Sequence, residues 1–148
     1  MAPLVAAAQR TIAAPAETLY DYVADFREHH PRFLPPAFSD FTVETGGIGV
    51  GTETSSRMTL GGRTQDLRTR VSRVEQGRLI EEVVLDQPMT TTFTFVPNGA
   101  GATVRIETTW QAGGGVSGLL ERLFAPRLLA RVYEDELGRL EAYAASRP

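Results

Sequence analysis

The stretch TFTFVPNGAGATVRIETTW, residues 92–110, decides the fold. It contains two runs in which apolar and polar residues alternate, joined by Asn98-Gly99, a pair typical of a tight β-turn. Side chains on a strand alternate between two faces. The large apolar residues of both runs therefore fall on one face: Phe93, Phe95, Val104, Ile106 and Trp110. The stretch predicts an antiparallel hairpin with one buried face.

Similar turn signals recur through residues 38–112, and the five of them predict six strands, mostly joined as hairpins. The signals are Gly46-Gly47, Gly61-Gly62, Gln76-Gly77, Gln87-Pro88 and Asn98-Gly99. Residues 4–13 predict one more strand. A helix is expected to begin at Ala14-Pro15, and a second short helix is expected over 27–34.

After Gly113-Gly114-Gly115, a helical pattern closes the chain to about Ser146. Pro126 is expected to separate a loose first segment from the main helix. Beyond it, one apolar stripe has the spacing of a buried helix face: Ala130, Tyr133, Leu137, Leu140 and Ala144, widened by Leu128 and Val132. These elements predict an α+β fold in which a curved, seven-stranded antiparallel sheet wraps around a long C-terminal helix. A flat two-layer domain with a solid core is the alternative.

Composition indicates one soluble globular domain, residues 1–148, with a net charge of −3. All fifteen basic residues are arginines and they are interspersed with acids, so a nucleic-acid partner is not expected. No apolar run is long enough to span a bilayer, and no signal peptide is recognisable, so a cytoplasmic location is expected. The absence of cysteine excludes disulfides and thiol chemistry.

The register of the hairpins can be worked out from the turns. A two-residue turn at Gly61-Gly62 places Arg57 opposite Asp66 and Glu53 opposite Arg70 on an exposed face. The opposite face then carries Met58 with Gln65, Ser56 with Leu67, and Thr54 with Thr69.

Counting from the turn at Gln76-Gly77 places Glu82 on this same inner face, opposite Val71. A separate count from Phe93 agrees, and it also places Arg73 on the inner face beside Glu82. The inner face is thus a mixture of apolar and polar residues. Burying unpaired polar groups costs about 1–3 kcal/mol each, so the pattern favours a ligand cavity of roughly 300–1,000 Å³ over a solid core. A register shift, or threonines that bond within the sheet, would be the alternative explanation.

Several segments resemble one family: RTIAAPAETLYDYVAD (10–25), FLPP (33–36), GIGVGTETS (47–55), VEQGRLIEE (74–82), TFTFVPNGAGATVRIETTW (92–110) and GLLERLFAPRLLARVYEDELGRLEAYA (118–144). The sequence is similar to the START-like, helix-grip or SRPBCC superfamily, and especially to its bacterial polyketide cyclase/dehydrase-like branch. The resemblance implies a hydrophobic cavity between sheet and helix that takes lipids, quinones or polyketides. It specifies the fold but no particular activity.

His29 and His30 are the only histidines. Neighbouring helical residues project about 100° apart and no third ligand is apparent, so no metal site is expected. Both are expected to finish a helix by interacting with its free carbonyls and to border the portal, where Phe33 and Leu34 would form a lid. A histidine acting as a base stays open as an alternative.

Glu82 is the stronger candidate for chemistry, because a carboxyl group facing an apolar cavity has a raised pKa and can act as general acid or base. The alternative is an ion pair with Arg73. The residues expected to contact a ligand are Phe33, Leu34, Ser56, Met58, Gln65, Leu67, Glu82, Phe93, Phe95, Trp110, Leu128 and Tyr133.

The sequence therefore predicts a binding protein for a small hydrophobic or aromatic molecule, with no cofactor and no metal, as a monomer or weak homodimer. Two alternatives remain open at this point. One is a polyketide aromatase/cyclase or dehydratase that uses Glu82 or a histidine to move protons. The other is a regulatory or interaction module without catalysis.

Overall fold

The structure is a computed structural model that describes residues 2–147. Within that range the elements follow one another in the predicted order. They are β1 (Leu4–Ile12), α1 (Ala16–Ala24), the 3-10 helix η1 (His30–Phe33), β2 (Phe38–Thr45), β3 (Glu53–Leu60), β4 (Arg63–Glu75), β5 (Leu79–Val84), β6 (Met89–Asn98), β7 (Gly101–Trp110) and α2 (Gly115–Ala145).

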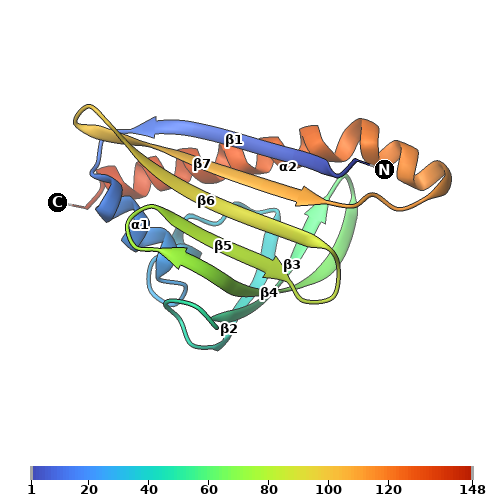
Figure 1. Cartoon of the computed structure of the whole chain (residues 1–148), viewed down its shortest axis with the longest axis horizontal. Helices are drawn as coiled ribbons and strands as arrows, with labels where there is room; N and C mark the ends of the chain where they lie inside the picture. The colour runs from blue at the N-terminus through green and yellow to red at the C-terminus, as the bar shows by residue number, and fades with distance from the viewer. Residues whose placement is uncertain (1, 148) are drawn as a thin grey trace.

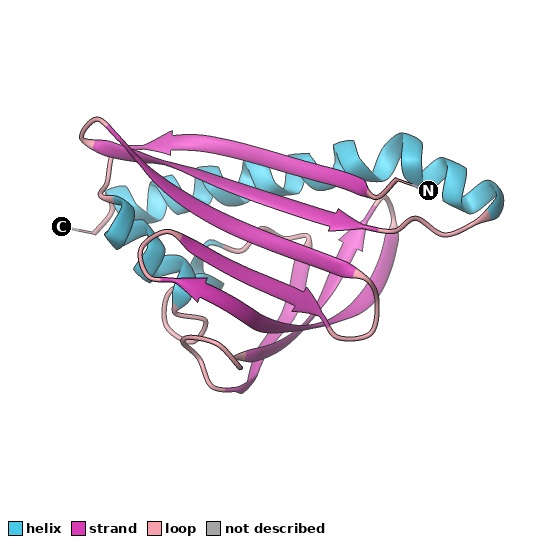
Figure 2. Cartoon of the chain, viewed as in Figure 1, coloured by secondary structure: helices cyan, strands magenta, loops and turns pink. Residues whose placement is uncertain are grey.

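The seven strands form one antiparallel sheet in the order β1-β7-β6-β5-β4-β3-β2. Strands β2 to β7 are joined as successive hairpins, and β1 completes the sheet by pairing with β7. Figure 1 shows the sheet curving around α2, which runs along the long axis of the molecule. Figure 2 shows α1 and η1 together near one end of that helix. The predicted helix-grip fold is confirmed, and the flat two-layer alternative is wrong.

The register of the β3–β4 hairpin is the predicted one, from Leu60 opposite Arg63 to Glu53 opposite Arg70. On the outer face, Arg70 Nη2 lies 2.8 Å from Glu53 Oε2. Threonine and serine occupy much of the inner face, as the turn arithmetic predicts.

A bulge in β4 changes the predicted role of Arg73. Val71 pairs with Glu82 as predicted, but the register then shifts and Arg73 pairs with Glu81. An extra residue in one strand moves every later side chain to the opposite face. The prediction that Arg73 shares the face of Glu82 is therefore wrong. The Arg73 side chain is 53% exposed and contacts Glu75 and Glu81 instead.

The β5–β6 hairpin differs from the prediction by two residues. Glu82 pairs with Thr91 and Ile80 with Phe93, whereas Phe93 was expected opposite Glu82. Because side chains on a strand repeat every two residues, a shift of two leaves each side chain on its predicted face. Glu82 and Phe93 both still face α2, where they line the same cavity.

Helix α2 is continuous from Gly115 to Ala145, with Pro126 inside it. The predicted break at Pro126 is wrong. A proline removes one backbone hydrogen bond, and the neighbouring turns continue the helix. The residues of α2 buried beyond Pro126 follow 3–4 spacing: Leu129, Tyr133, Glu136, Leu137 and Leu140. No helix in residues 2–147 has both the length and the apolar character needed to cross a bilayer.

Candidate ligand-binding cavity

A cavity, called the inner cavity below, lies between the concave face of the sheet and the middle of α2. Its volume is about 70 Å³, less than the predicted range, because large side chains project into the space. Its lining residues are Phe26, His30, Leu34, Phe38, Phe41, Thr54, Ser56, Met58, Leu67, Thr69, Glu82, Val84, Met89, Thr91, Phe93, Leu129, Tyr133 and Glu136. Most of this lining is apolar, with polar groups from the sheet, η1 and α2.

Glu82 reaches the inner cavity from β5, as both register counts predict. Its neighbours across the sheet are Val71 and Thr91, and Val71 is buried. Glu82 is half-buried and borders the inner cavity. Burial disfavours the charged form and raises the pKa of Glu82 from 4.5 to about 7. With Arg73 on the other face, the alternative of a Glu82–Arg73 ion pair is wrong.

Glu136 is a second acidic group in the inner cavity, and sequence reasoning missed it. It lies on the buried face of α2, one turn beyond Tyr133, and is only 3% exposed. Burial and then the nearby charge of Glu82 raise its pKa from 4.5 to about 8. Its Oε2 atom has no hydrogen-bond partner among residues 2–147. The available signal was its spacing within the apolar stripe, between Tyr133 and Leu140.

His30 closes one end of the inner cavity and is buried. Its Nδ1 lies 2.7 Å from the carbonyl oxygen of Val23 in the last turn of α1, so Nδ1 carries the proton and donates it. This is the helix-end contact predicted for the histidines. The ring also stacks on Phe26, with centroids 4.7 Å apart. Burial lowers the pKa of His30 to about 4, so the ring is neutral at neutral pH.

The His29 side chain contacts helix α2 instead. Its Nδ1 lies 2.6 Å from the Tyr143 hydroxyl, near the C-terminal end of α2, and it does not line the inner cavity. The two histidines therefore do not converge on one point. Within residues 2–147, no three His, Asp or Glu side chains are grouped closely enough to hold a metal ion.

Hydroxyl groups beside the inner cavity form a hydrogen-bonded chain from α2 to the sheet. The Tyr133 hydroxyl bonds to the Thr108 hydroxyl, which is 2.7 Å from Thr91 Oγ1. A second pair, Thr54 and Thr69, bonds across β3 and β4 at 2.7 Å. The predicted alternative of threonines bonding within the sheet thus explains part of the polar inner face. It leaves the two glutamates unexplained.

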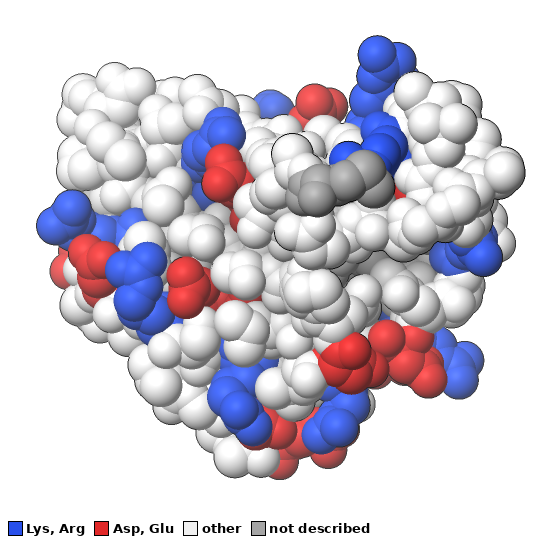
Figure 3. Space-filling view, turned by 45° about the vertical axis from the view of Figure 1, so that its right-hand side comes forward, with Lys and Arg blue, Asp and Glu red and all other residues white. Residues whose placement is uncertain are grey.

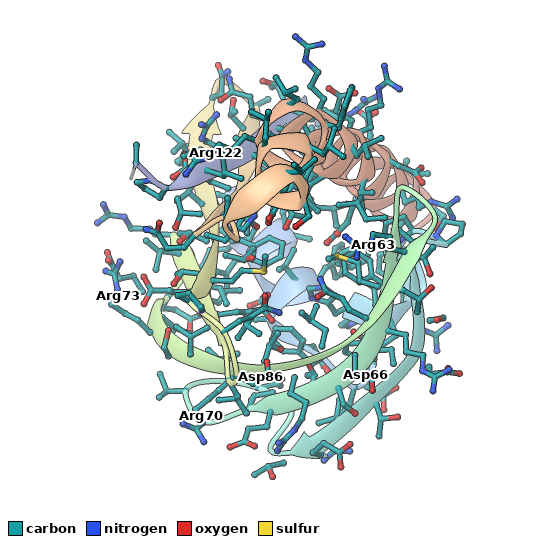
Figure 4. All side chains as sticks on the ribbon, turned by 90° about the vertical axis from the view of Figure 1, so that its right-hand side faces the viewer. Arg63, Asp66, Arg70, Arg73, Asp86 and Arg122 are labelled. Atoms are coloured by element: carbon teal, nitrogen blue, oxygen red, sulfur yellow. The ribbon has the colours of Figure 1, made fainter. Side chains whose placement is uncertain are left out.

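A wider groove lies beyond the inner cavity, between the β3–β4 hairpin and the first half of α2. This outer groove has a volume of about 590 Å³. Its walls are Met58, Leu60, Gly61, Arg63, Thr64, Gln65, Ser117, Leu120, Glu121, Phe124, Ala125 and Leu128. Met58 lines both spaces. Figure 4 looks toward this end, with Arg63 on the inner side of the sheet and Arg70 and Arg73 on the outer side.

The predicted ligand contacts divide among these spaces. Leu34, Ser56, Met58, Leu67, Glu82, Phe93 and Tyr133 line the inner cavity, and Gln65 and Leu128 line the outer groove.

Three other predicted contacts line neither space. Phe33 is buried beside Tyr143, and Phe95 packs edge-on against Tyr20. Trp110 borders a separate surface depression, and its indole N–H donates to Glu121 at 2.8 Å.

The chain matches the family described as polyketide cyclase/dehydrase and lipid transport over residues 4–145. This protein belongs to that family. The match covers the whole sheet, both small helices and all of α2. The predicted resemblance to START-like, polyketide cyclase-like proteins is confirmed. None of the curated proteins matches the chain.

Several solved structures share this fold. The KanY protein is 26% identical, with a TM-score of 0.85, covering 97% of this chain and 98% of KanY. The Zhui aromatase/cyclase from a Streptomyces species is 16% identical, with a TM-score of 0.80, covering 98% and 95%. The major latex-like protein 151 from Panax ginseng is 11% identical, with a TM-score of 0.75, covering 97% and 98%. The two more distant likenesses support the fold alone.

Proposed function

We propose that this family member binds a small hydrophobic or aromatic molecule, lipid-, quinone- or polyketide-like, between the sheet and α2. One end of the molecule occupies the inner cavity, and the rest lies in the outer groove past Met58. The observation that carries this proposal is the unpartnered Oε2 of Glu136, buried beside Glu82 in a mainly apolar cavity. A buried polar atom without a partner is costly, and a ligand that reaches it would offset that cost.

The volume of the two spaces supports this two-part arrangement. The inner cavity alone holds only a small group, whereas the outer groove has about 590 Å³, within the range of small-molecule sites. Leu120 and Phe124 provide an apolar wall although they are 51% and 57% exposed. Exposed apolar side chains beside a groove are typical of a binding surface.

The test is to purify the protein gently, record its native mass spectrum, and identify any molecule released on denaturation. Ser56→Phe would fill the inner cavity, because Ser56 points into it. Ser55→Phe is the matched control, since its neighbour Ser55 faces outward and bonds to Glu44. We expect the bound molecule to be lost from the first variant and kept by the second. Equal retention by both variants would reject the proposal.

A second candidate function is that of an aromatase/cyclase or dehydratase. The observation that favours it is the presence of two carboxyl groups whose pKa values, about 7 and about 8, lie near the operating pH of a general acid or base. The inner cavity and the outer groove together would hold a poly-β-keto chain in a folded conformation while Glu82 moved a proton. Incubation with such a chain, followed by product analysis, tests this. Turnover that Glu82→Gln abolishes would support it, and no turnover would leave binding as the function.

A further inference from the structure

The inner cavity is acidic and has no built-in cation. Glu82 reaches it from β5 and Glu136 from α2, while no arginine of residues 2–147 lines it. Arg73, the alternative partner considered for Glu82, lies on the opposite face of the sheet. On the face of the molecule seen in Figure 3, acidic and basic side chains are interspersed. The lining of the inner cavity differs, because among residues 2–147 it contains two acidic residues and no arginine.

The other titratable groups of the inner cavity do not compensate for the two acids. His30 from η1 is neutral, and its Nε2 is 3.7 Å from Glu136 Oε2, too far for a hydrogen bond. Tyr133 from α2 uses its hydroxyl on Thr108. The lining residues from β2, β3, β4 and β6 carry no charge. The cavity thus lacks a donor for Glu136 Oε2 and a positive charge for two carboxyl groups.

The walls around these carboxyl groups are rich in aromatic rings, namely Phe26, Phe38, Phe41 and Phe93. Aromatic rings attract cations through their negative faces, most strongly where water is excluded. An anionic ligand group in the same place would lose its hydration water and would gain no positively charged partner from these walls. A group that is both cationic and a hydrogen-bond donor matches this lining.

We propose that the ligand is an amphiphilic amine whose ammonium group enters the inner cavity, donates to Glu136 Oε2 and is neutralised by Glu136 and Glu82. This inference rests on the proposed function and specifies its ligand. An ammonium group is small enough for a space of about 70 Å³. The apolar remainder passes Met58 into the outer groove, where Leu120, Phe124 and Leu128 contact it.

The experiment compares three probes of similar size by titration calorimetry: 4-phenylbutylamine, 4-phenylbutanol and 4-phenylbutyrate. We expect the amine to bind at least about tenfold more tightly than the alcohol at pH 8.5, and the carboxylate to bind most weakly. The preference should shrink toward pH 6. The pKa values of Glu82 and Glu136, about 7 and about 8, leave both groups largely protonated there, while the amine keeps its charge.

Glu136→Gln should reduce the affinity for the amine to about that for the alcohol, because the variant keeps a hydrogen-bonding group but loses the negative charge. Glu134→Gln, an exposed acid on the same helix, is the control and should change neither affinity. Circular dichroism would check that both variants are folded. A preference for the amine that survives Glu136→Gln and Glu82→Gln would overturn the inference.

The outcomes separate this inference from the proposed function. If the alcohol binds as tightly as the amine at pH 8.5, the amine inference is wrong and ligand binding stands. If none of the three probes binds, the amine inference is also wrong. The proposed function is then decided by whether Ser56→Phe loses its co-purified molecule.

Discussion

The side chains of Glu136 and His30 are neighbours in the lining of the inner cavity, with Oε2 and Nε2 3.7 Å apart, and do not form an ion pair. An ion pair would lower the pKa of Glu136 and raise that of His30. Both shifts run the other way, to about 8 for Glu136 and about 4 for His30, because burial disfavours each charged form. Desolvation thus outweighs the attraction between them. At neutral pH, His30 is neutral and Glu136 is largely protonated.

This arrangement predicts that the protein loses stability as the pH rises. The pKa values of Glu82 and Glu136 are raised from 4.5 to about 7 and about 8, so the folded state keeps protons that the unfolded chain releases. The free energy of unfolding then falls with pH between about 4.5 and 8. Below pH 6.5, His30 opposes this fall, because the unfolded chain protonates its imidazole first. We expect the steepest fall between pH 6.5 and 8.

Chemical denaturation at a series of pH values checks this prediction. The loss between pH 5 and 8.5 should be on the order of 1–4 kcal/mol, and Glu136→Gln should remove a large part of it. Glu134→Gln, the exposed control, should follow the wild type. A free energy of unfolding that rises over this range would mean that the carboxyl groups are ionised in the folded state.

The two adjacent histidines should differ in their contribution to stability. His30→Ala removes a buried ring, its bond to the Val23 carbonyl and its stacking on Phe26, so a loss of roughly 2–4 kcal/mol is expected. His29→Ala removes one partly exposed contact with Tyr143 and should cost less than about 1 kcal/mol. Thermal melts of both variants measure the difference. Equal losses in the two variants would show that the buried contacts of His30 contribute no more to stability than the partly exposed contact of His29.

The sequence predicted the faces of the strands more reliably than their pairings. The β5–β6 count was off by two residues, yet Glu82 faced inward because the alternation repeats every two residues. The bulge between Val71 and Arg73 shifted the count by one, which reversed the face of Arg73. No turn residue marks that bulge, so the alternation alone could not reveal it.

For helix α2, the sequence predicted most of the buried face but missed one residue on it. Its buried face was predicted from apolar spacing, which led to Tyr133 and Leu137 but passed over Glu136, because an acidic residue on a helix is usually solvated. The volume of the inner cavity could not be predicted either. It depends on how far side chains such as Phe26 and Met58 project into the space, and strand register does not determine that.

The buried face of α2 should be critical for stability. Leu137 is 1% exposed and belongs to the hydrophobic core, so Leu137→Ala should lower the free energy of unfolding by about 2–5 kcal/mol. Leu119→Ala on the same helix makes the same chemical change at a position that is 58% exposed. It should cost less than about 0.5 kcal/mol. Urea denaturation of the two variants measures both values, and similar losses would contradict the observed packing of α2.

Met58 should control how large a molecule the protein accepts. Its side chain is 4% exposed and lines both the inner cavity and the outer groove. Met58→Ala would join the two spaces, so a large neutral dye such as Nile red should bind more tightly and fluoresce more strongly. Part of the stability would be lost at the same time, about 2–5 kcal/mol, because a buried side chain is truncated.

Leu67→Ala is the matched control for this variant. Leu67 is 9% exposed and lines the inner cavity without reaching the outer groove. Its truncation enlarges the inner cavity and lowers stability, but it leaves Met58 in place between the two spaces. If both variants bind Nile red equally well, added volume alone explains the gain. Met58 then does not separate the two spaces in solution. If only Met58→Ala increases the binding of Nile red, the path from the outer groove to Glu82 and Glu136 runs past the Met58 side chain.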